Sequence, residues 1–182
     1  ISLKNILTKI NKPVKTNIII VGDIIIDKYV NCTPIGMSEE APLVVVKEIE
    51  DKLFVGGAGI VSQHIKSMKK NPYLLSVCGD DEHYDMIKKE LKFTKVRNRI
   101  FKDKDRMTTL KTRYIVDKQK LFRVSKLDEN PINEDLEKRI IRIIENNIYK
   151  THILIISDFV YGVITESMLD KILKLRKKYN FI

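Results

Sequence analysis

Residues 17–23 read Asn-Ile-Ile-Ile-Val-Gly-Asp, a continuous β-branched run that ends in a glycine and an acid. A run without polar alternation is typical of a strand buried on both faces, and such strands belong to parallel sheets covered by helices. Two further runs have the same character, residues 73–80 ending in Gly-Asp and residues 152–158 ending in Ser-Asp. The sequence therefore predicts an α/β fold on a mostly parallel sheet.

Helical patterns separate these strands. Residues 60–68 carry apolar side chains at helical spacing after a glycine-rich start. Asn133 precedes an apolar stripe and Thr165 precedes the final helical pattern, so both are predicted N-caps. Residues 181–182 begin the pattern of one more strand, which the chain does not complete.

Another group of strands has mixed polarity. These strand-like stretches are residues 43–49, 96–101, 107–116 and 121–127. Their alternation of apolar and polar side chains suits a sheet with one wet face. They are predicted to form a small antiparallel layer outside the main sheet.

Composition restricts the class of protein. A chain of 182 residues with 43% hydrophobic residues suits one soluble globular domain. No apolar run approaches the ~18 residues of a membrane span, and the first four residues lack the layout of a signal peptide. A cytoplasmic location is therefore expected. Cys32 and Cys78 form no Cys-x-x-Cys pair and the three histidines are scattered, so no metal site is expected.

The net charge of +10 suggests a nucleic-acid partner, because clustered Lys and Arg neutralise phosphates. The basic residues are nevertheless spread along the chain, Lys outnumbers Arg, and no basic stripe is interleaved with aromatic residues. A solvated basic surface is favoured over a nucleic-acid face, and a phosphorylated small substrate would also benefit from the positive field.

Acids and glycines at the strand ends are candidate ligand contacts. Asp23, Asp80 and Asp158 follow predicted parallel strands, and open α/β sheets bind ligands at that edge. The alternative, at least as well supported for Asp80 and Asp158, is that they simply end the strands.

Residues 56–59, Gly-Gly-Ala-Gly, allow close backbone approach at a helix start, but they match neither a Walker A loop nor a dinucleotide fingerprint. A plain tight turn is an equal alternative.

The combination of motifs resembles the ribokinase-like (PfkB) carbohydrate kinases. Gly22 is followed by Asp27, then by a lid-like strand, then by Gly-Gly at a helix start, in that family's order. Residues 38–44, 109–113, 119–123 and 157–165 are similar, in the same order, to segments of heptose 7-phosphate kinases, the kinase half of ADP-heptose synthesis enzymes. The resemblance implies a ribokinase-like fold with a sugar pocket between an α/β domain and a β-sheet lid, which often serves as a dimer interface.

The resemblance also implies roles for particular residues. Asp27 would accept hydrogen bonds from sugar hydroxyls, since a carboxylate is a charge-assisted acceptor. Gly56 and Gly57 would bring backbone against the sugar. The cations that would hold a phosphate on the sugar are Lys111, Arg113 and Arg123, for which exposed strand charges are a nearly equal alternative.

The chain also departs from the family. Ile60 stands where the family commonly has Asn, and Glu39 stands where the similar segment has Pro. The family's Gly-Ala-Gly-Asp motif, which supplies the catalytic base, and its Asn-x-x-Glu motif for magnesium do not occur. The resemblance implies ATP and Mg²⁺ as cofactors. Their binding sites and every catalytic residue are expected outside residues 1–182. Residues 1–182 are interpreted as the N-terminal part of a kinase domain, inactive alone, with lid strands at 31–50 and 96–127.

Three functions are compatible with these observations. The leading one is ATP-dependent phosphorylation of a sugar or sugar phosphate of the heptose 7-phosphate type. The second is a catalytically inactive sugar-binding or dimerisation module, suggested by Ile60 and the missing motifs. The third is a Rossmann-type nucleotide-binding domain, which the lid strands argue against. The expected partners are a sugar or sugar phosphate and a second copy through the lid, without nucleic acid or membrane.

Overall fold

The computed structural model describes residues 16–182, and it contains two four-stranded sheets. The N-terminal segment in which no signal peptide was predicted lies outside the described residues. Sheet A is wholly parallel, in the order β5-β4-β1-β8. Its strands are β1 (Asn17–Gly22), β4 (Asn71–Gly79), β5 (Arg97–Asp103) and β8 (Ile153–Ser157). The predicted parallel sheet is confirmed, with β1 at its centre.

Helices cover both faces of sheet A. Their bounds are α2 (Ala58–Ser67), α3 (His83–Phe93), α4 (Glu134–Ile148) and α5 (Glu166–Lys178). Alternate residues of β1 enter two separate cores: Ile18 and Ile20 join the side of α2 and α3, whereas Ile19 joins the side of α4 and α5. This two-sided burial explains why β1 is apolar from Ile18 to Val21.

The predicted caps of the last two helices are confirmed. Asn133 accepts a hydrogen bond from the backbone N–H of Leu136 at 3.0 Å, and Thr165 accepts one from Met168 at 3.0 Å. Each side chain satisfies an N–H group that has no partner within its helix. Ile182 donates to the carbonyl of His152 and accepts from Leu154, so the predicted strand start lies beside β8.

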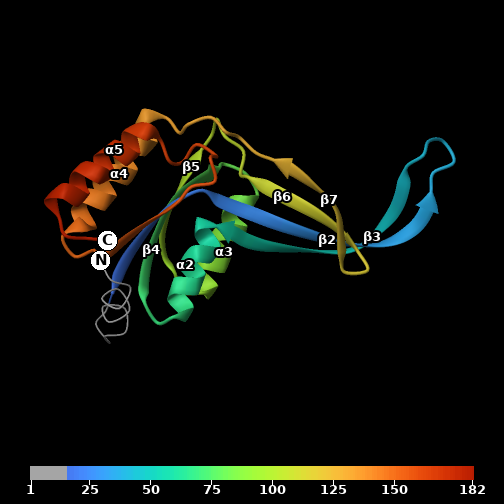
Figure 1. The fold of residues 1–182 in the computed structure, drawn as a ribbon, viewed down its shortest axis with the longest axis horizontal. Helices are drawn as coiled ribbons and strands as arrows, with labels where there is room; N and C mark the ends of the chain where they lie inside the picture. Colours follow the sequence, from blue (N-terminus) through green and yellow to red (C-terminus); the bar gives the residue numbers. More distant parts are fainter. Residues whose placement is uncertain (1–15) are drawn as a thin grey trace.

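Sheet B forms an elongated arm that extends away from sheet A (Figure 1). Its order is β3-β2-β6-β7, with strands β2 (Ile24–Met37), β3 (Val44–Gly57), β6 (Leu110–Val116) and β7 (Gln119–Lys126). The β2/β3 and β6/β7 pairs are antiparallel, as predicted, but β2 and β6 are parallel to each other, so the sheet is mixed. The reason is that both strands enter the arm from sheet A and therefore run outward in the same direction.

One strand of the predicted lid was assigned to the wrong sheet. The strand at residues 96–101 is β5, and it pairs with β4 at the edge of sheet A. Its polarity is mixed because an edge strand exposes Arg97 and Arg99 while Ile100 and Phe101 enter the cores. β2 runs through Pro34 and Gly36 to its end at residue 37 and accommodates them through a shift in register.

The helices of residues 16–182 include none that is long and apolar enough to cross a membrane.

Candidate functional site

Asp27 lies at the base of the arm, held between a glycine and an arginine. In the β2/β3 ladder Gly56 lies opposite Ile25, next to Asp27, and a Cβ on Gly56 would be 2.2 Å from the Asp27 Oδ2 atom. Arg113 Nη1 donates a hydrogen bond to Asp27 Oδ1, forming an ion pair that is partly open to solvent. Only glycine leaves room for this carboxylate, and the arginine fixes its orientation.

An open hollow of about 480 Å³ lies beside this carboxylate. The lining residues are Asp27, Tyr29, Phe54, Val55, Gly56 and Ile60. The rings of Tyr29 and Phe54 meet edge to face, with centroids 5.7 Å apart. The hollow is therefore mostly apolar, with one acidic group able to accept hydrogen bonds.

Lys111 is the neighbour of Asp27 in the parallel β2/β6 ladder. It is 8% exposed, and its ammonium lies 5.3 Å from the ring centroid of Phe159 and 4.8 Å from that of Tyr161. These two rings belong to the loop after β8, so this contact joins the arm to sheet A. Cation–π attraction holds the ammonium at the base of the arm.

Arg113 and Arg123 lie opposite each other in the β6/β7 ladder. Because paired residues share a face and positions two apart along a strand return to it, Lys111, Arg113 and Arg123 line the same face as Asp27. The structure thus brings four of the predicted site residues to one face. Arg123 is exposed and is not part of the hollow.

Gly57 lies at the junction of β3 and α2. It adopts φ 58° as the N-cap of α2, and a Cβ there would lie 2.3 Å from the carbonyl oxygen of Asp23. It is buried and does not line the hollow. Its requirement for glycine therefore comes from the tight passage between β3 and α2.

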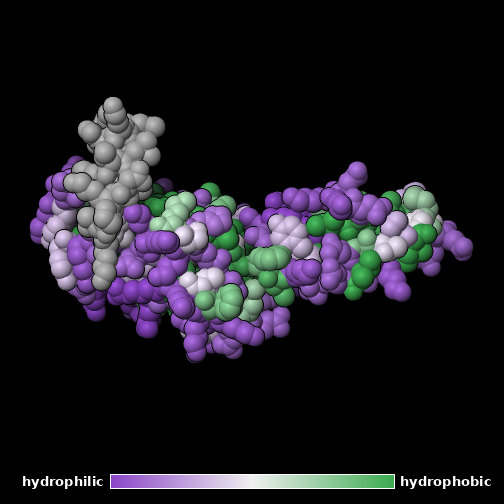
Figure 2. All heavy atoms as spheres, turned by 90° about the horizontal axis from the view of Figure 1, so that it is seen from below, coloured by the Kyte–Doolittle hydropathy of each residue, from purple (hydrophilic) through white to green (hydrophobic). Residues whose placement is uncertain are grey.

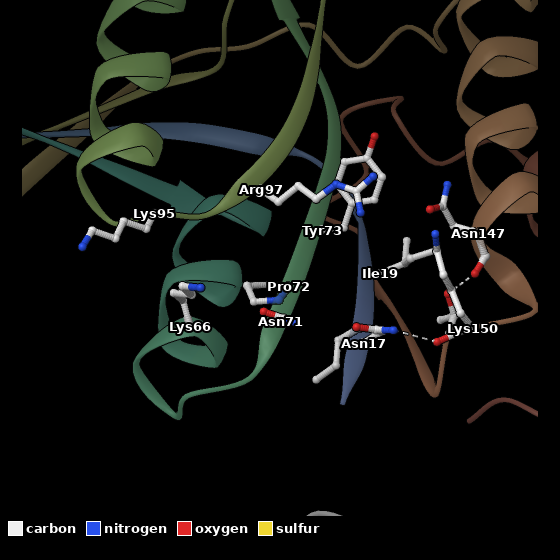
Figure 3. A pocket seen from close by; sticks show the side chains of 12 residues that line it. Asn17, Ile19, Lys66, Asn71, Pro72, Tyr73, Lys95, Arg97, Asn147 and Lys150 are labelled. Carbon is white, nitrogen blue, oxygen red and sulfur yellow. Dashed lines mark hydrogen bonds between the residues drawn. The ribbon is translucent and has the colours of Figure 1, made fainter. Parts of the chain in front are cut away.

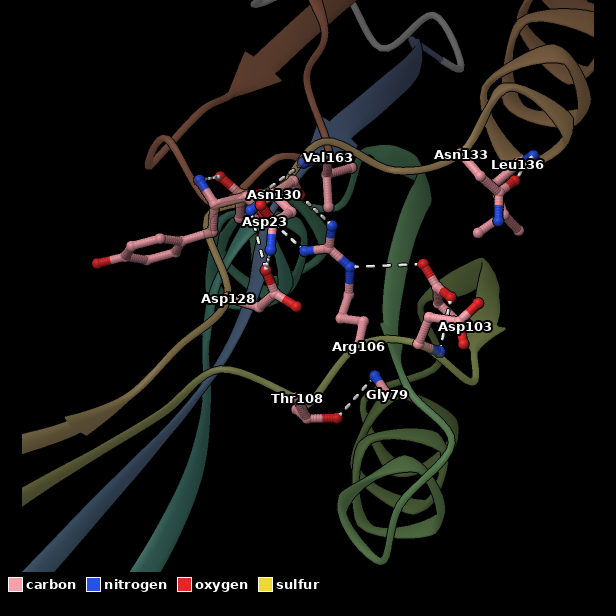
Figure 4. A network of polar contacts seen from close by, with 12 residues as sticks. Asp23, Gly79, Asp103, Arg106, Thr108, Asp128, Asn130, Asn133, Leu136 and Val163 are labelled. Atoms are coloured by element: carbon pink, nitrogen blue, oxygen red, sulfur yellow. Dashed lines mark hydrogen bonds and ion pairs between the residues drawn. The ribbon is translucent and has the colours of Figure 1, made fainter.

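Asp23 is an anchor for the loop that follows β8 (Figure 4). Its carboxylate accepts hydrogen bonds from the backbone N–H groups of Phe159 (2.7 Å), Tyr161 (3.3 Å) and Val163 (3.2 Å). Burial raises the pKa of the Asp23 carboxyl, and these three hydrogen bonds oppose that shift. With an exposure of 1%, Asp23 acts within the protein and does not reach the hollow.

The other strand-end acids have local partners. Asp80 forms an exposed ion pair with Lys102 at 2.7 Å, and Asp158 accepts from the N–H of Val160 within its own loop. These contacts favour the strand-end interpretation of both acids.

Within residues 16–182 no group of three His, Cys, Asp or Glu side chains is placed to hold a metal ion. Cys78 is buried, and desolvation raises the pKa of its thiol to about 12, which suits a structural role.

Sequence reasoning missed Arg106, whose side chain is 6% exposed. Its guanidinium donates to the carbonyl oxygens of Tyr161 (2.6 Å) and Asn130 (2.5 Å), and its Nε lies 3.7 Å from Asp103 Oδ2 (Figure 4). Arg106 and Asp23 therefore hold the same loop from two sides. No motif marks Arg106, because two of its partners are backbone carbonyls distant in sequence.

Comparison with solved structures identifies the class of fold. Phosphofructokinase-2 from Escherichia coli, in complex with fructose-6-phosphate, matches with a TM-score of 0.72 and 14% identity, covering 91% of this chain and 52% of that one. Ribokinase from Giardia lamblia matches with a TM-score of 0.63 and 13% identity, covering 90% and 50%. The chain therefore has the fold of the ribokinase-like sugar kinases, with an α/β body and a β arm.

Sequence comparison is more specific, although no family model matches the chain. The bifunctional protein HldE of Helicobacter pylori (strain Shi470) is 33% identical over 164 residues, which cover 90% of this chain and 35% of that protein. HldE of Aliarcobacter butzleri is 32% identical over 165 residues, with the same shares. The resemblance to ribokinase-like carbohydrate kinases of the HldE type is thereby confirmed, and the chain spans about a third of the length of these relatives.

Proposed function

We propose that this chain supplies the sugar-binding part of an ATP-dependent kinase for a sugar phosphate of the heptose 7-phosphate type. The observation that carries the proposal is the Asp27 carboxylate, which Arg113 holds and Gly56 leaves room for, beside the hollow at the base of the arm. A fixed carboxylate next to an apolar wall is suited to accept hydrogen bonds from neighbouring hydroxyl groups while the wall covers the sugar ring.

The charges on the same face support a phosphorylated substrate. Arg113 uses one amino group on Asp27, and a guanidinium has further donors for a phosphate. Lys111 adds a point charge on the same face, and Arg123 adds a second fork opposite Arg113 on the neighbouring strand. We infer that the sugar hydroxyls lie at Asp27 and that the phosphate lies toward the arginines.

ATP and Mg²⁺ are part of the proposal, but the described residues offer no cluster of ligands for the metal. Phosphoryl transfer depends on positioning and on electrostatic stabilisation of the transferred group. We therefore assign residues 16–182 only substrate binding, and we propose that the chain is inactive alone. We also propose that residues 1–182 are the N-terminal part of one kinase domain in the cytoplasm.

A binding experiment and an activity experiment test this function. Calorimetric titration with a heptose 7-phosphate and with the same heptose lacking phosphate should show tighter binding of the phosphorylated sugar. The Asp27→Asn variant should weaken both, whereas Arg123→Gln should weaken only the phosphorylated one. In the natural full-length protein, mass spectrometry should detect a second phosphate on the sugar in the presence of ATP. Absence of turnover with any sugar or sugar phosphate would contradict the kinase assignment.

The second candidate is a catalytically inactive sugar-binding or dimerisation module. Ile60 lines the hollow and is 36% exposed. Because its side chain is apolar, it offers no polar contact to a sugar. The arm also exposes apolar side chains, including Ile35, Met37, Val44 and Ile49, each more than 60% exposed. Figure 2 shows hydrophobic atoms on the surface of the arm. An exposed apolar surface of this kind suits a second copy of the chain. Sedimentation of wild type and of the Val44→Asp variant tests the dimer, which the charge should dissociate.

The third candidate, a Rossmann-type domain, is less favoured because the four-stranded arm has no place in a dinucleotide fold. Titration with labelled dinucleotides should show no binding.

A further inference from the structure

Four arginines gather on the α/β body, beside the outer edge of sheet A. Arg97 and Arg99 come from the edge strand β5, and Arg139 and Arg142 come from α4. We call this set the arginine face, and we propose that it binds a small oligophosphate anion. The proposal is independent of the sugar kinase function.

Aromatic rings hold three of these guanidinium groups in place. The guanidinium carbon of Arg97 lies 3.9 Å from the ring centroid of Tyr73 (Figure 3). Those of Arg99 and Arg139 lie 5.2 Å and 4.7 Å from the ring centroid of Phe101. Stacking occupies the flat face of a guanidinium and leaves its N–H edge free, so the forks are pre-ordered for phosphate oxygens.

Two hollows adjoin the arginine face. One, of about 390 Å³, is lined by Tyr73, Arg99, Phe101, Arg139, Arg142 and Ile143. The other, of about 280 Å³, shares Tyr73 and is lined by Arg97, three lysines and several uncharged residues (Figure 3). Neither hollow has an acidic residue in its lining. Both therefore present space and positive charge to an anion.

The positive charge of this face is largely uncompensated. Arg139 pairs with Asp135 at 3.4 Å on the exposed surface of α4. Arg97, Arg99 and Arg142 form no ion pair with any residue of 16–182. Arg99 and Arg139 both lie near the Phe101 ring, so two like charges share one surface, and an anion that contacts both relieves their repulsion.

The same geometry favours a small anion over a nucleic acid. Single-stranded nucleic acids stack their bases on free aromatic faces. Here guanidiniums cover the rings of Tyr73 and Phe101, and Phe101 is only 4% exposed.

Charges on an edge strand also discourage pairing with other strands. That role needs charge alone, so it predicts no advantage for arginine over lysine.

The test is calorimetric titration with inorganic tripolyphosphate at fixed salt. The Arg99→Lys/Arg139→Lys double variant keeps the charge but loses the forks and the stacking. We expect it to bind about tenfold more weakly or worse, as for the loss of charge-assisted hydrogen bonds. The matched control, Arg176→Lys on the exposed surface of α5, should bind as wild type does. Circular dichroism establishes that each variant is folded, and Arg142→Lys replaces the double variant if that one is not.

Several results would overturn the proposal. They are undetectable binding of tripolyphosphate to wild type, unchanged affinity in the double variant, or an equal loss in the Arg176→Lys control. If only Arg113→Lys lowered the affinity for tripolyphosphate, the anion would bind at the arm and not at the arginine face. Tighter binding of a single-stranded oligonucleotide than of tripolyphosphate, abolished by the same double variant, would show that the face binds nucleic acid instead.

Discussion

Replacement of Gly56 by alanine tests whether this glycine exists to make room for the Asp27 carboxylate. The added Cβ would lie 2.2 Å from Asp27 Oδ2, whereas ordinary contact begins at 3.4 Å. The carboxylate must therefore retreat by about 1 Å, and misplacements of that size cost on the order of 100-fold in the rate of a reaction that depends on the group's position. Overpacking of this kind also lowers the free energy of unfolding by about 1–3 kcal/mol.

The assay is a double-mutant cycle on the free energy of unfolding, measured by urea denaturation with circular dichroism. Gly56→Ala is compared in the wild type and in the Asp27→Ala background, where the colliding oxygen is absent. We expect the penalty of Gly56→Ala to be largely removed in that background, while calorimetry shows weaker sugar binding in either single variant. An equal penalty in both backgrounds would refute the reasoning, since the glycine would then be required for another reason.

Three further predictions concern other contacts. Burial tends to raise the pKa of Glu137, but hydrogen bonds from Lys171 and two hydroxyls lower it overall. The ionised carboxylate therefore stabilises the fold at pH values above its usual pKa of 4.5. This contribution to stability is lost as the pH falls through the lower pKa of the folded state. Glu137→Gln should therefore lower the melting temperature at neutral pH, and its effect should shrink as the pH falls through the lowered folded pKa of Glu137. Arg106→Lys loses the fork that holds two carbonyls and should reduce the free energy of unfolding by about 1–3 kcal/mol in urea titrations, whereas no change would show that the loop is held elsewhere. Phe159→Ala removes one ring beside Lys111 and should weaken calorimetric binding of a sugar phosphate about threefold, from roughly 0.5–1 kcal/mol of cation–π attraction, with the unphosphorylated sugar as the unaffected control.

Most of sheet A was predictable because burial on two faces leaves a simple pattern. β1 is apolar at each central position, and Asn133 and Thr165 mark helix starts through their own side chains. β5 was assigned to the wrong sheet because an edge strand of sheet A has the same mixed polarity as a strand of the arm. Polarity reports exposure, and exposure alone does not identify the partner strand.

The site was only partly predictable for a related reason. Spacing and resemblance indicated Asp27 and Arg113, and the fold brings them into contact across 86 positions of sequence. The role of Gly57 depends on a contact with the Asp23 carbonyl, which no local pattern reveals. The arginine face escaped detection because β5 and α4 contribute to it separately, and neither segment alone is a basic stripe interleaved with aromatic residues.

The direct passage from β1 into β2 has a mechanical consequence. β1 ends at Gly22 and β2 begins at Ile24, so the chain enters the arm without a flexible linker. A strand advances about 3.3 Å per residue, which places Asp27 roughly 13 Å and Met37 roughly 46 Å along the arm from Asp23. If the arm swings about this junction, its tip travels more than three times as far as Asp27. In such a swing Asp27 would lie near the pivot and move little, while the residues at the far end of the arm would move much further.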